Sequence, residues 1–228
     1  MDRGMHFTRA PTTRRSGLLA PLFLTGVTIF SPAPAQEAAL PRDDSEYIIF
    51  IIDTSGSMFN HAWPMMLKKV EETLNLYPKV KGFQVMNDEG AYLFNGQRGK
   101  WIPDTPAERR TALERLRTWN AFSNSNQIEG IVEAIRTYHE KDKKISLYVF
   151  GDEFTGPSID SVVNGVDVIN REDETGERRV RIHAVGFPLR PDAPQYTSTQ
   201  FATLMRSMCQ RNGGAFVALD EPERSRTR

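Results

Sequence analysis

The sequence lacks several features that would narrow its function at once. Its one cysteine, Cys209, excludes an internal disulfide, so the fold must rest on a hydrophobic core. We expect Cys209 to be buried on an apolar helix face, with a disulfide to a second molecule as the alternative. Basic and acidic residues balance at 29 each, which gives no electrostatic reason to expect nucleic acid or an anionic membrane as partner. We find no internal repeat and no Gly-x-x-x-x-Gly-Lys-Ser/Thr phosphate loop, so one globular domain is the expectation.

The first 35 residues have the three parts of a secretory signal peptide. Four arginines precede an apolar run at 17–30, which is followed by an Ala-x-Ala cleavage site at Ala33 and Ala35. The apolar run is short for a transmembrane helix and contains Pro21, so a retained anchor is the weaker alternative. We predict cleavage after Ala35 and export to the periplasm or the medium, with no stable membrane insertion afterwards. Cleavage removes four of 29 basic and one of 29 acidic residues, which leaves a formal net charge of −3.

Segments rich in β-branched residues alternate with segments of helical periodicity along the rest of the chain. This order predicts an α/β fold, a doubly wound and mostly parallel six-stranded sheet with helices on both faces. We expect strands at 47–52, 81–86, 91–94, 145–150, 180–187 and 215–219, and helices at 62–77, 105–119, 128–138 and 159–169. A last helix should follow a capping pattern at 197–200 and stop at 212–214, and a capping box at 105–108 should start the second helix. The hairpin turn at 87–90 makes 91–94 an antiparallel edge strand. The predicted organisation is a linker at 36–45, the folded domain at 46–220 and a charged tail at 221–228.

A polar cluster follows the first strand, where residues 47–58 read YIIFIIDTSGSM. The run of five apolar residues before Asp53 predicts a strand buried on both faces, so Asp53, Ser55 and Ser57 stand at its carboxyl end. Ligands bind at that edge in open α/β sheets. One carboxylate and two hydroxyls are hard oxygen donors that suit Mg²⁺. A turn whose Asp and Ser side chains only cap the next helix is the alternative interpretation.

The Asp53-x-Ser55-x-Ser57 pattern, after a buried strand and before a methionine, resembles the metal-ion-dependent adhesion site of von Willebrand factor type A domains, here of an exported bacterial kind. The resemblance in element order covers 46–219. It implies a third hydroxyl from Ser125, where the family usually has threonine, with Ser123 as a possible substitute. It also implies a second aspartate, Asp152 after the strand at 145–150, although the residues beside Asp152 differ from the family's usual Thr-Asp-Gly.

The resemblance implies that these five side chains hold one Mg²⁺ or Mn²⁺ ion. Ser55, Ser57 and Ser125 would be direct ligands, whereas Asp53 and Asp152 would bind directly or through water. In such domains an acidic side chain of a protein partner completes the coordination of the cation. We therefore expect an exported, metal-dependent protein-binding module, with an adhesion or assembly function and no catalysis.

Two other functions stay open at this point. One keeps the type A fold as a structural module of an envelope complex, with a vestigial metal site. The other is a Mg²⁺-dependent phosphatase with Asp53 as nucleophile, similar to haloacid-dehalogenase-like enzymes, which carry a second acid where this chain has Ser55. The loop at 95–101 bears on both binding functions, because its Trp101 is either an exposed contact or folded onto the core.

Overall fold

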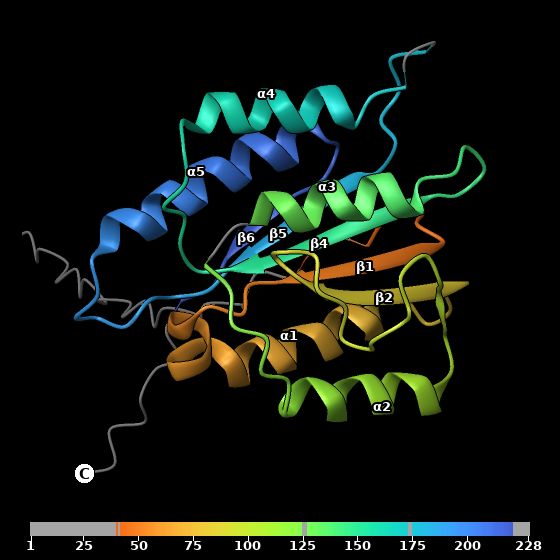
Figure 1. The fold of residues 1–228 in the computed structure, drawn as a ribbon, viewed down its shortest axis with the longest axis horizontal. Helices are drawn as coiled ribbons and strands as arrows, with labels where there is room; N and C mark the ends of the chain where they lie inside the picture. The colour runs from red at the N-terminus through yellow and green to blue at the C-terminus, as the bar shows by residue number, and fades with distance from the viewer. Residues whose placement is uncertain (1–39, 41, 125–126, 173–174, 221–228) are drawn as a thin grey trace, which may run out of the picture. The chain divides into compact units, whose positions relative to one another are not determined.

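A six-stranded sheet forms the centre of the fold (Figure 1). The computed structural model describes residues 40, 42–124, 127–172 and 175–220, so the predicted signal peptide and charged tail lie outside the described residues. The strands are β1 (Tyr47–Ile52), β2 (Gly82–Asn87), β3 (Ile102–Pro103), β4 (Ile145–Gly151), β5 (Arg181–Gly186) and β6 (Phe216–Ala218). Their order is β3-β2-β1-β4-β5-β6, and β3 alone of these is antiparallel to its neighbour. The order reverses between β1 and β4, which confirms the predicted doubly wound α/β sheet.

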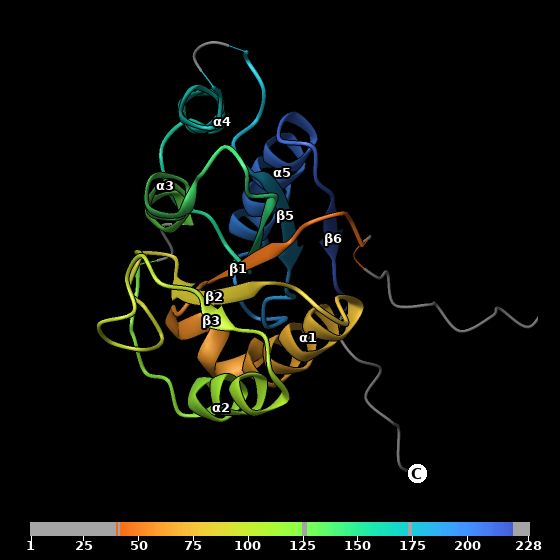
Figure 2. The same cartoon turned by 90° about the vertical axis from the view of Figure 1, so that its right-hand side faces the viewer.

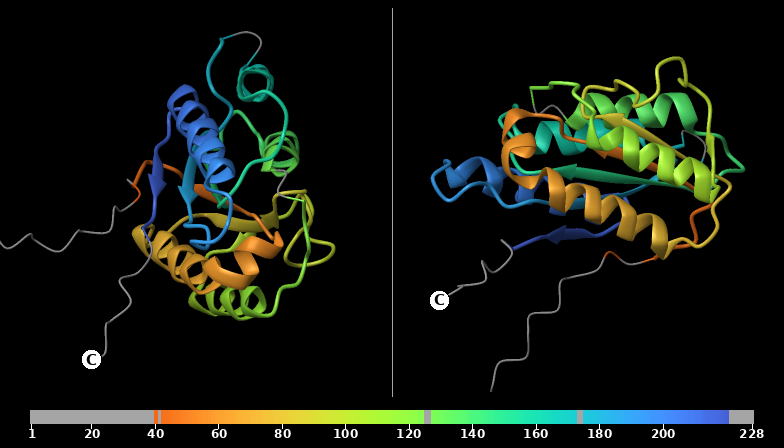
Figure 3. Two further views of the ribbon diagram at one scale, coloured as in Figure 1. Left: turned by 90° about the vertical axis from the view of Figure 1, so that its left-hand side faces the viewer. Right: turned by 90° about the horizontal axis from the view of Figure 1, so that it is seen from below.

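Two layers of helices cover the two faces of this sheet (Figures 2 and 3). The helices are η1, a π-helix (Met58–Ala62), α1 (Trp63–Leu76), α2 (Pro106–Arg117), α3 (Gln127–Tyr138), α4 (Ile159–Ile169) and α5 (Gln195–Arg211). Helices α1 and α2 pack on one face and α3, α4 and α5 on the other. Alternate residues of β1 enter the two cores, so Phe50 lies with α1 and Ile51 with α3. Cys209 is buried in the second core, as predicted.

The antiparallel edge of the sheet differs from the prediction. Of the segment 91–94, Tyr92 forms an isolated bridge to Met86, whereas the edge strand β3 pairs ten residues later, with Ile102 opposite Phe83. The chain leaves the sheet between these points through a loop with two left-handed glycines, at φ angles of 76° and 71°. Trp101 then packs between Tyr47 and Tyr138, with ring centroids 4.5 and 4.7 Å away. It is therefore folded onto the core, which was one of the two alternatives.

The helix starts follow the predicted capping residues in part. The amide of Glu108 donates to the Thr105 hydroxyl at 3.2 Å, as the predicted capping box requires. Helix α5 begins earlier than predicted, at Gln195, directly after Pro194, which is the N-cap residue in an extended conformation. Thr197 lies inside α5 and donates to the Pro194 carbonyl. In the ranges that the structure describes, no helix has the length and apolar character needed to cross a bilayer.

The amino ends of the strands are closed by a mostly buried carboxylate, Asp43, from the segment predicted as a linker. Its Oδ2 accepts hydrogen bonds from Ser146 at 2.7 Å and from His183 at 2.9 Å, and pairs with Arg181 at 2.8 Å. The hydroxyl of Tyr77 donates to its Oδ1 at 2.8 Å. Burial alone would raise the pKa of Asp43, but its hydrogen bonds, led by those from His183 and Arg181, hold it well below the usual range. Asp43 thus fastens the start of the domain to β4 and β5.

Replacing Asp43 by alanine should lower the free energy of unfolding by about 3 kcal/mol, because it leaves buried partners without their anion. Asp44→Ala is the matched control. Asp44 pairs with Lys144 and Arg181, but its side chain is 62% exposed against 11% for Asp43, so its loss should cost less than about 1 kcal/mol. Chemical denaturation at pH 7 measures both values. Since the pKa of Asp43 is lowered, its contribution should be complete above about pH 4 and decline progressively as the pH falls below that value. Equal losses for the two variants would contradict this anchoring role.

Candidate metal centre

Three neighbouring parallel strands are each followed by an aspartate at the same edge of the sheet. In the register of β2, β1 and β4, Ile52 lies opposite both Asn87 and Phe150. Asp88 and Asp53 follow directly, and Asp152 follows the last residue of β4. The backbone confirms this alignment, since the Asp88 amide donates to Ile52 and the Asp53 amide donates to Phe150. The carboxyl edge therefore gathers three buried carboxyl groups at the point where the strand order reverses.

The turn after β1 connects the two predicted aspartates through its serines. The Ser55 amide donates to Asp53 Oδ1 at 2.8 Å, which folds the turn back on the end of the strand. The hydroxyls of Ser55 and Ser57 lie 3.0 Å apart. Ser57 also donates to Asp152 Oδ1 at 3.1 Å and lies 3.3 Å from Glu153 Oε1. The structure thus brings together four of the five predicted site residues, Asp53, Ser55, Ser57 and Asp152.

The third predicted hydroxyl, Ser125, lies outside the described residues. The described chain stops just before it at Asn124, whose amide donates to Glu89 Oε1 at 2.9 Å, and resumes at Gln127 in the first turn of α3. Ser123, the possible substitute, has a buried hydroxyl without a partner among the described residues. Both described flanks of Ser125 therefore belong to the carboxyl edge, because Gln127 contacts Asp53 there.

Two residues at this edge were not predicted as part of the site. Gln127 is fully buried and donates from Nε2 to Asp53 Oδ2 at 2.9 Å. Asp88 accepts from the Thr54 amide at 3.3 Å, so it supports the turn from the side of β2. The rule that places ligands after parallel strands would have found Asp88, whereas its turn-forming neighbours favoured a plain hairpin. The sequence carries no comparable signal for Gln127.

Among the residues that the structure describes, the aspartates at this edge have too few hydrogen-bond donors and positive charges around them to offset the cost of burying their ionised forms. Burial raises the pKa of Asp53 well above its usual value, and the charges of Asp88 and Asp152 raise it further. Burial also raises the pKa of Asp152 to about 7, with the charge of Glu153 adding to the effect and the Ser57 hydrogen bond opposing it. In the described part of the chain, Asp53 and Asp152 accept hydrogen bonds from serine, glutamine and backbone groups. An added cation would relieve this repulsion.

The side chains present fit a divalent cation that prefers oxygen. Asp152 Oδ2 and Gln127 Oε1 are buried without a hydrogen-bond partner among the described residues, and such orphaned acceptors call for a proton, a water or a cation. No group of three histidine, cysteine, aspartate or glutamate side chains in the described ranges is arranged to hold a metal. A cation at this edge would therefore depend on the hydroxyls of Ser55 and Ser57 beside the carboxyl groups. That donor set suits Mg²⁺ or Mn²⁺ better than Zn²⁺.

Comparison with solved structures identifies the fold. A von Willebrand factor type A protein from Catenulispora acidiphila superposes with a TM-score of 0.56 at 13% identity, over 78% of this chain and 39% of that one. This chain has the von Willebrand factor type A fold. The open conformation of the pilus adhesin SpaC from Lactobacillus rhamnosus GG contains a similar fold, with a TM-score of 0.51 at 11% identity, over 81% of this chain and 29% of that one. This chain thus spans well under half the length of either protein.

Comparison of the sequence with family models and with curated proteins does not assign the chain to a family. No protein-family model matches the chain, and no curated protein matches it either. At 11–13% identity the likeness concerns the fold alone.

The raised pKa of Asp152 predicts how stability depends on pH without divalent cations. Between about pH 4 and pH 7 the folded state holds a proton on Asp152 that the unfolded chain has lost, so stability falls as the pH rises. Each pKa unit corresponds to about 1.4 kcal/mol. Denaturation from pH 4 to pH 8 in EDTA should show this fall, and Asp152→Asn should flatten it. The exposed Asp142 provides the matched control, Asp142→Asn, which should keep the wild-type slope.

Excess Mg²⁺ should reduce or reverse the same fall, because the ion binds the ionised carboxylates and opposes their repulsion. A wild-type stability that rises with pH in EDTA would contradict the electrostatic account of this edge.

Proposed function

We propose that this protein is an exported adhesion or assembly module that binds its partner through a divalent cation at the carboxyl edge of β1 and β4. Asp53, Ser55, Ser57 and Asp152 would hold Mg²⁺ or Mn²⁺, with Ser125 supplying the third hydroxyl. When bound, the cation would offer positive charge to an acidic side chain of the partner. The observation that carries the proposal is the hydrogen-bonded chain from Asp53 through Ser55 and Ser57 to Asp152.

The division of labour among these side chains supports binding rather than chemistry. Gln127 and the Ser55 amide fix the two oxygens of Asp53, so this carboxylate has little freedom to attack a substrate. Ser57 contacts both Ser55 and Asp152, so it connects the turn after β1 with the turn after β4. The serine hydroxyls add no negative charge to the coordination shell, so the cation could still bind one anionic group from outside. The phosphatase alternative gains no support from these contacts.

The fold neighbours and the leader sequence support the proposed setting. The type A fold occurs in the pilus adhesin SpaC, an adhesion protein by its description. The predicted signal peptide at 1–35 would carry this chain to the periplasm or the medium, where an adhesion or assembly module would act. The described helices include no membrane-spanning one. We therefore place the partner outside the cytoplasm, as a protein that presents a Glu or Asp side chain.

Calorimetry with MgCl₂ and with MnCl₂ tests the metal site directly. Wild type should bind one ion, Asp53→Ala should abolish the heat, and Ser55→Ala should weaken binding at least about tenfold, because one oxygen donor is lost. Ser161→Ala is the matched control, an exposed serine on α4 that should leave affinity unchanged. No heat with wild type, or equal heat with Ser55→Ala, would favour the structural module with a vestigial site.

Capture of partners from an envelope extract tests the second half of the proposal. Immobilised wild type should retain partner proteins in MgCl₂ and release them in EDTA, and Asp53→Ala should retain none of them. Carbodiimide blocking of carboxyl groups in the extract, before it meets the protein, should remove the same partners. Identical capture in MgCl₂, in EDTA and by Asp53→Ala would refute a metal-bridged contact.

A further inference from the structure

Large apolar side chains that are well exposed are few in the described ranges, and one of them belongs to a cluster. Phe122, Val168 and Tyr196 are 72%, 75% and 65% exposed. Single exposed apolar residues are common and need no explanation. Phe122 differs because its ring lies 6.0 Å from that of Phe59, which stacks on Trp63 at 4.0 Å and an interplanar angle of 25°. We call Phe59, Trp63 and Phe122 the aromatic ledge.

The three side chains of the aromatic ledge extend from the core to the surface. Trp63 is buried at the start of α1, Phe59 is partly buried in η1, and Phe122 is exposed in the loop before α3. A partner that covers Phe122 would pay little conformational entropy to order the ring beside it, since Phe59 is already held by Trp63. An aromatic side chain held in this way loses little freedom when a partner covers it, which is a property of residues that dominate binding energy.

Both segments that carry the ledge also lead to the metal centre. The Phe59 amide donates to the Ser55 carbonyl at 3.2 Å, so the ledge begins one helical turn after the serines that would hold the cation. On the other side, Asn124, two residues after Phe122, binds Glu89 next to Asp88. Phe59 thus follows the turn that carries Ser55 and Ser57, and Phe122 lies in the loop whose Asn124 binds Glu89 after β2, so the ledge lies at the carboxyl edge beside the metal centre.

The charges around the metal centre restrict what can lie against it. Five acidic side chains follow the ends of β1, β2 and β4, namely Asp53, Asp88, Glu89, Asp152 and Glu153. They outnumber the charge of one divalent cation, so a run of acids in a partner would be repelled. A single carboxylate would reach the cation with the least repulsion. The partner residues next to this carboxylate would add most binding energy if they are apolar, because the ledge offers them an uncharged, apolar surface.

We propose that the aromatic ledge is part of the partner-binding surface, and that the partner segment carries one Glu or Asp flanked by an apolar or aromatic residue. This inference rests on the proposed function and narrows its partner class. The carboxylate would meet the cation, and the neighbouring apolar side chain would lie on Phe122 and Phe59. Acidic runs and isolated acids among polar residues would bind poorly.

Selection from a random heptapeptide display library tests the inference on the full chain. In MgCl₂, wild type should enrich peptides with one acid and, within two positions of it, Phe, Tyr, Trp, Leu or Ile. Phe122→Ser should still select the acid but no apolar neighbour, and it should weaken the best wild-type peptide about tenfold in fluorescence polarisation. Because Phe122 is mostly exposed, this variant should keep the wild-type melting temperature.

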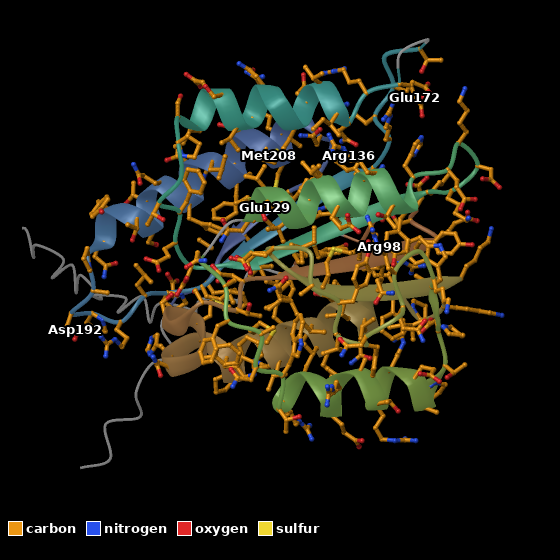
Figure 4. All side chains as sticks on the ribbon, in the orientation of Figure 1. Arg98, Glu129, Arg136, Glu172, Asp192 and Met208 are labelled. Carbon is orange, nitrogen blue, oxygen red and sulfur yellow. The ribbon has the colours of Figure 1, made fainter. Side chains whose placement is uncertain are left out.

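Val168→Ser is the matched control. Val168 is as exposed as Phe122 but lies near the end of α4, next to Asn170, whose amide group binds Val180 just before β5. This places it at the amino edge, the end where Figure 4 shows Glu172, opposite Asp192 in the loop before α5. Val168→Ser should select the wild-type peptides with unchanged affinity.

The possible failures separate the inference from the proposed function. Acid selection without apolar neighbours in wild type, or identical peptides with wild type and Phe122→Ser, would overturn the ledge and leave the metal-bridged contact standing. No magnesium-dependent selection of acids by wild type would overturn both.

Discussion

The structure depends on the burial of carboxyl groups at the ends of neighbouring parallel strands. Parallel pairing fixes the register of β2, β1 and β4, so the aspartates that follow these strands, Asp88, Asp53 and Asp152, all lie at one edge of the sheet. A buried carboxylate is tolerated when something positive or a set of donors accompanies it. At this edge the donors described are hydroxyls and amides, which lower the pKa of these groups less than burial raises it. The proposed cation would therefore stabilise this edge by offsetting the charge of its ionised carboxylates.

The opposite edge of the same sheet shows how the protein solves this problem with its own residues. Asp43 is mostly buried, yet Arg181 and His183 accompany it, and its pKa is lowered rather than raised. At the amino edge the charge of Asp43 is therefore balanced by the protein itself, and these contacts hold the start of the domain to β4 and β5. At the carboxyl edge, Asp53 and Asp152 have no such partners among the described residues, and this edge includes the point where the strand order reverses, which is where open α/β sheets bind ligands. Asp43 is thus stabilised by residues of the protein itself, whereas the proposed cation would accompany the aspartates of the carboxyl edge.

The sequence predicts the parts of the fold that depend on local patterns. The apolar run before Asp53 and the serines after it are contiguous, and Asp152 follows an equally clear strand, so both ligand turns could be placed. The edge strand could not, because β3 pairs at Gly82, where any larger side chain would meet Trp101 2.9 Å away. That close approach is a contact between distant segments. Likewise Gln127 reaches Asp53 only through the packing of α3 against β1, which no local pattern reveals.

A crystal of the full chain soaked in MnCl₂, measured for anomalous scattering, tests the central claim most directly. The account predicts one manganese peak between the ends of β1 and β4, in contact with the hydroxyls of Ser55 and Ser57 and close to Asp53 and Asp152. Peaks confined to other parts of the surface, or none at saturating MnCl₂, would contradict it.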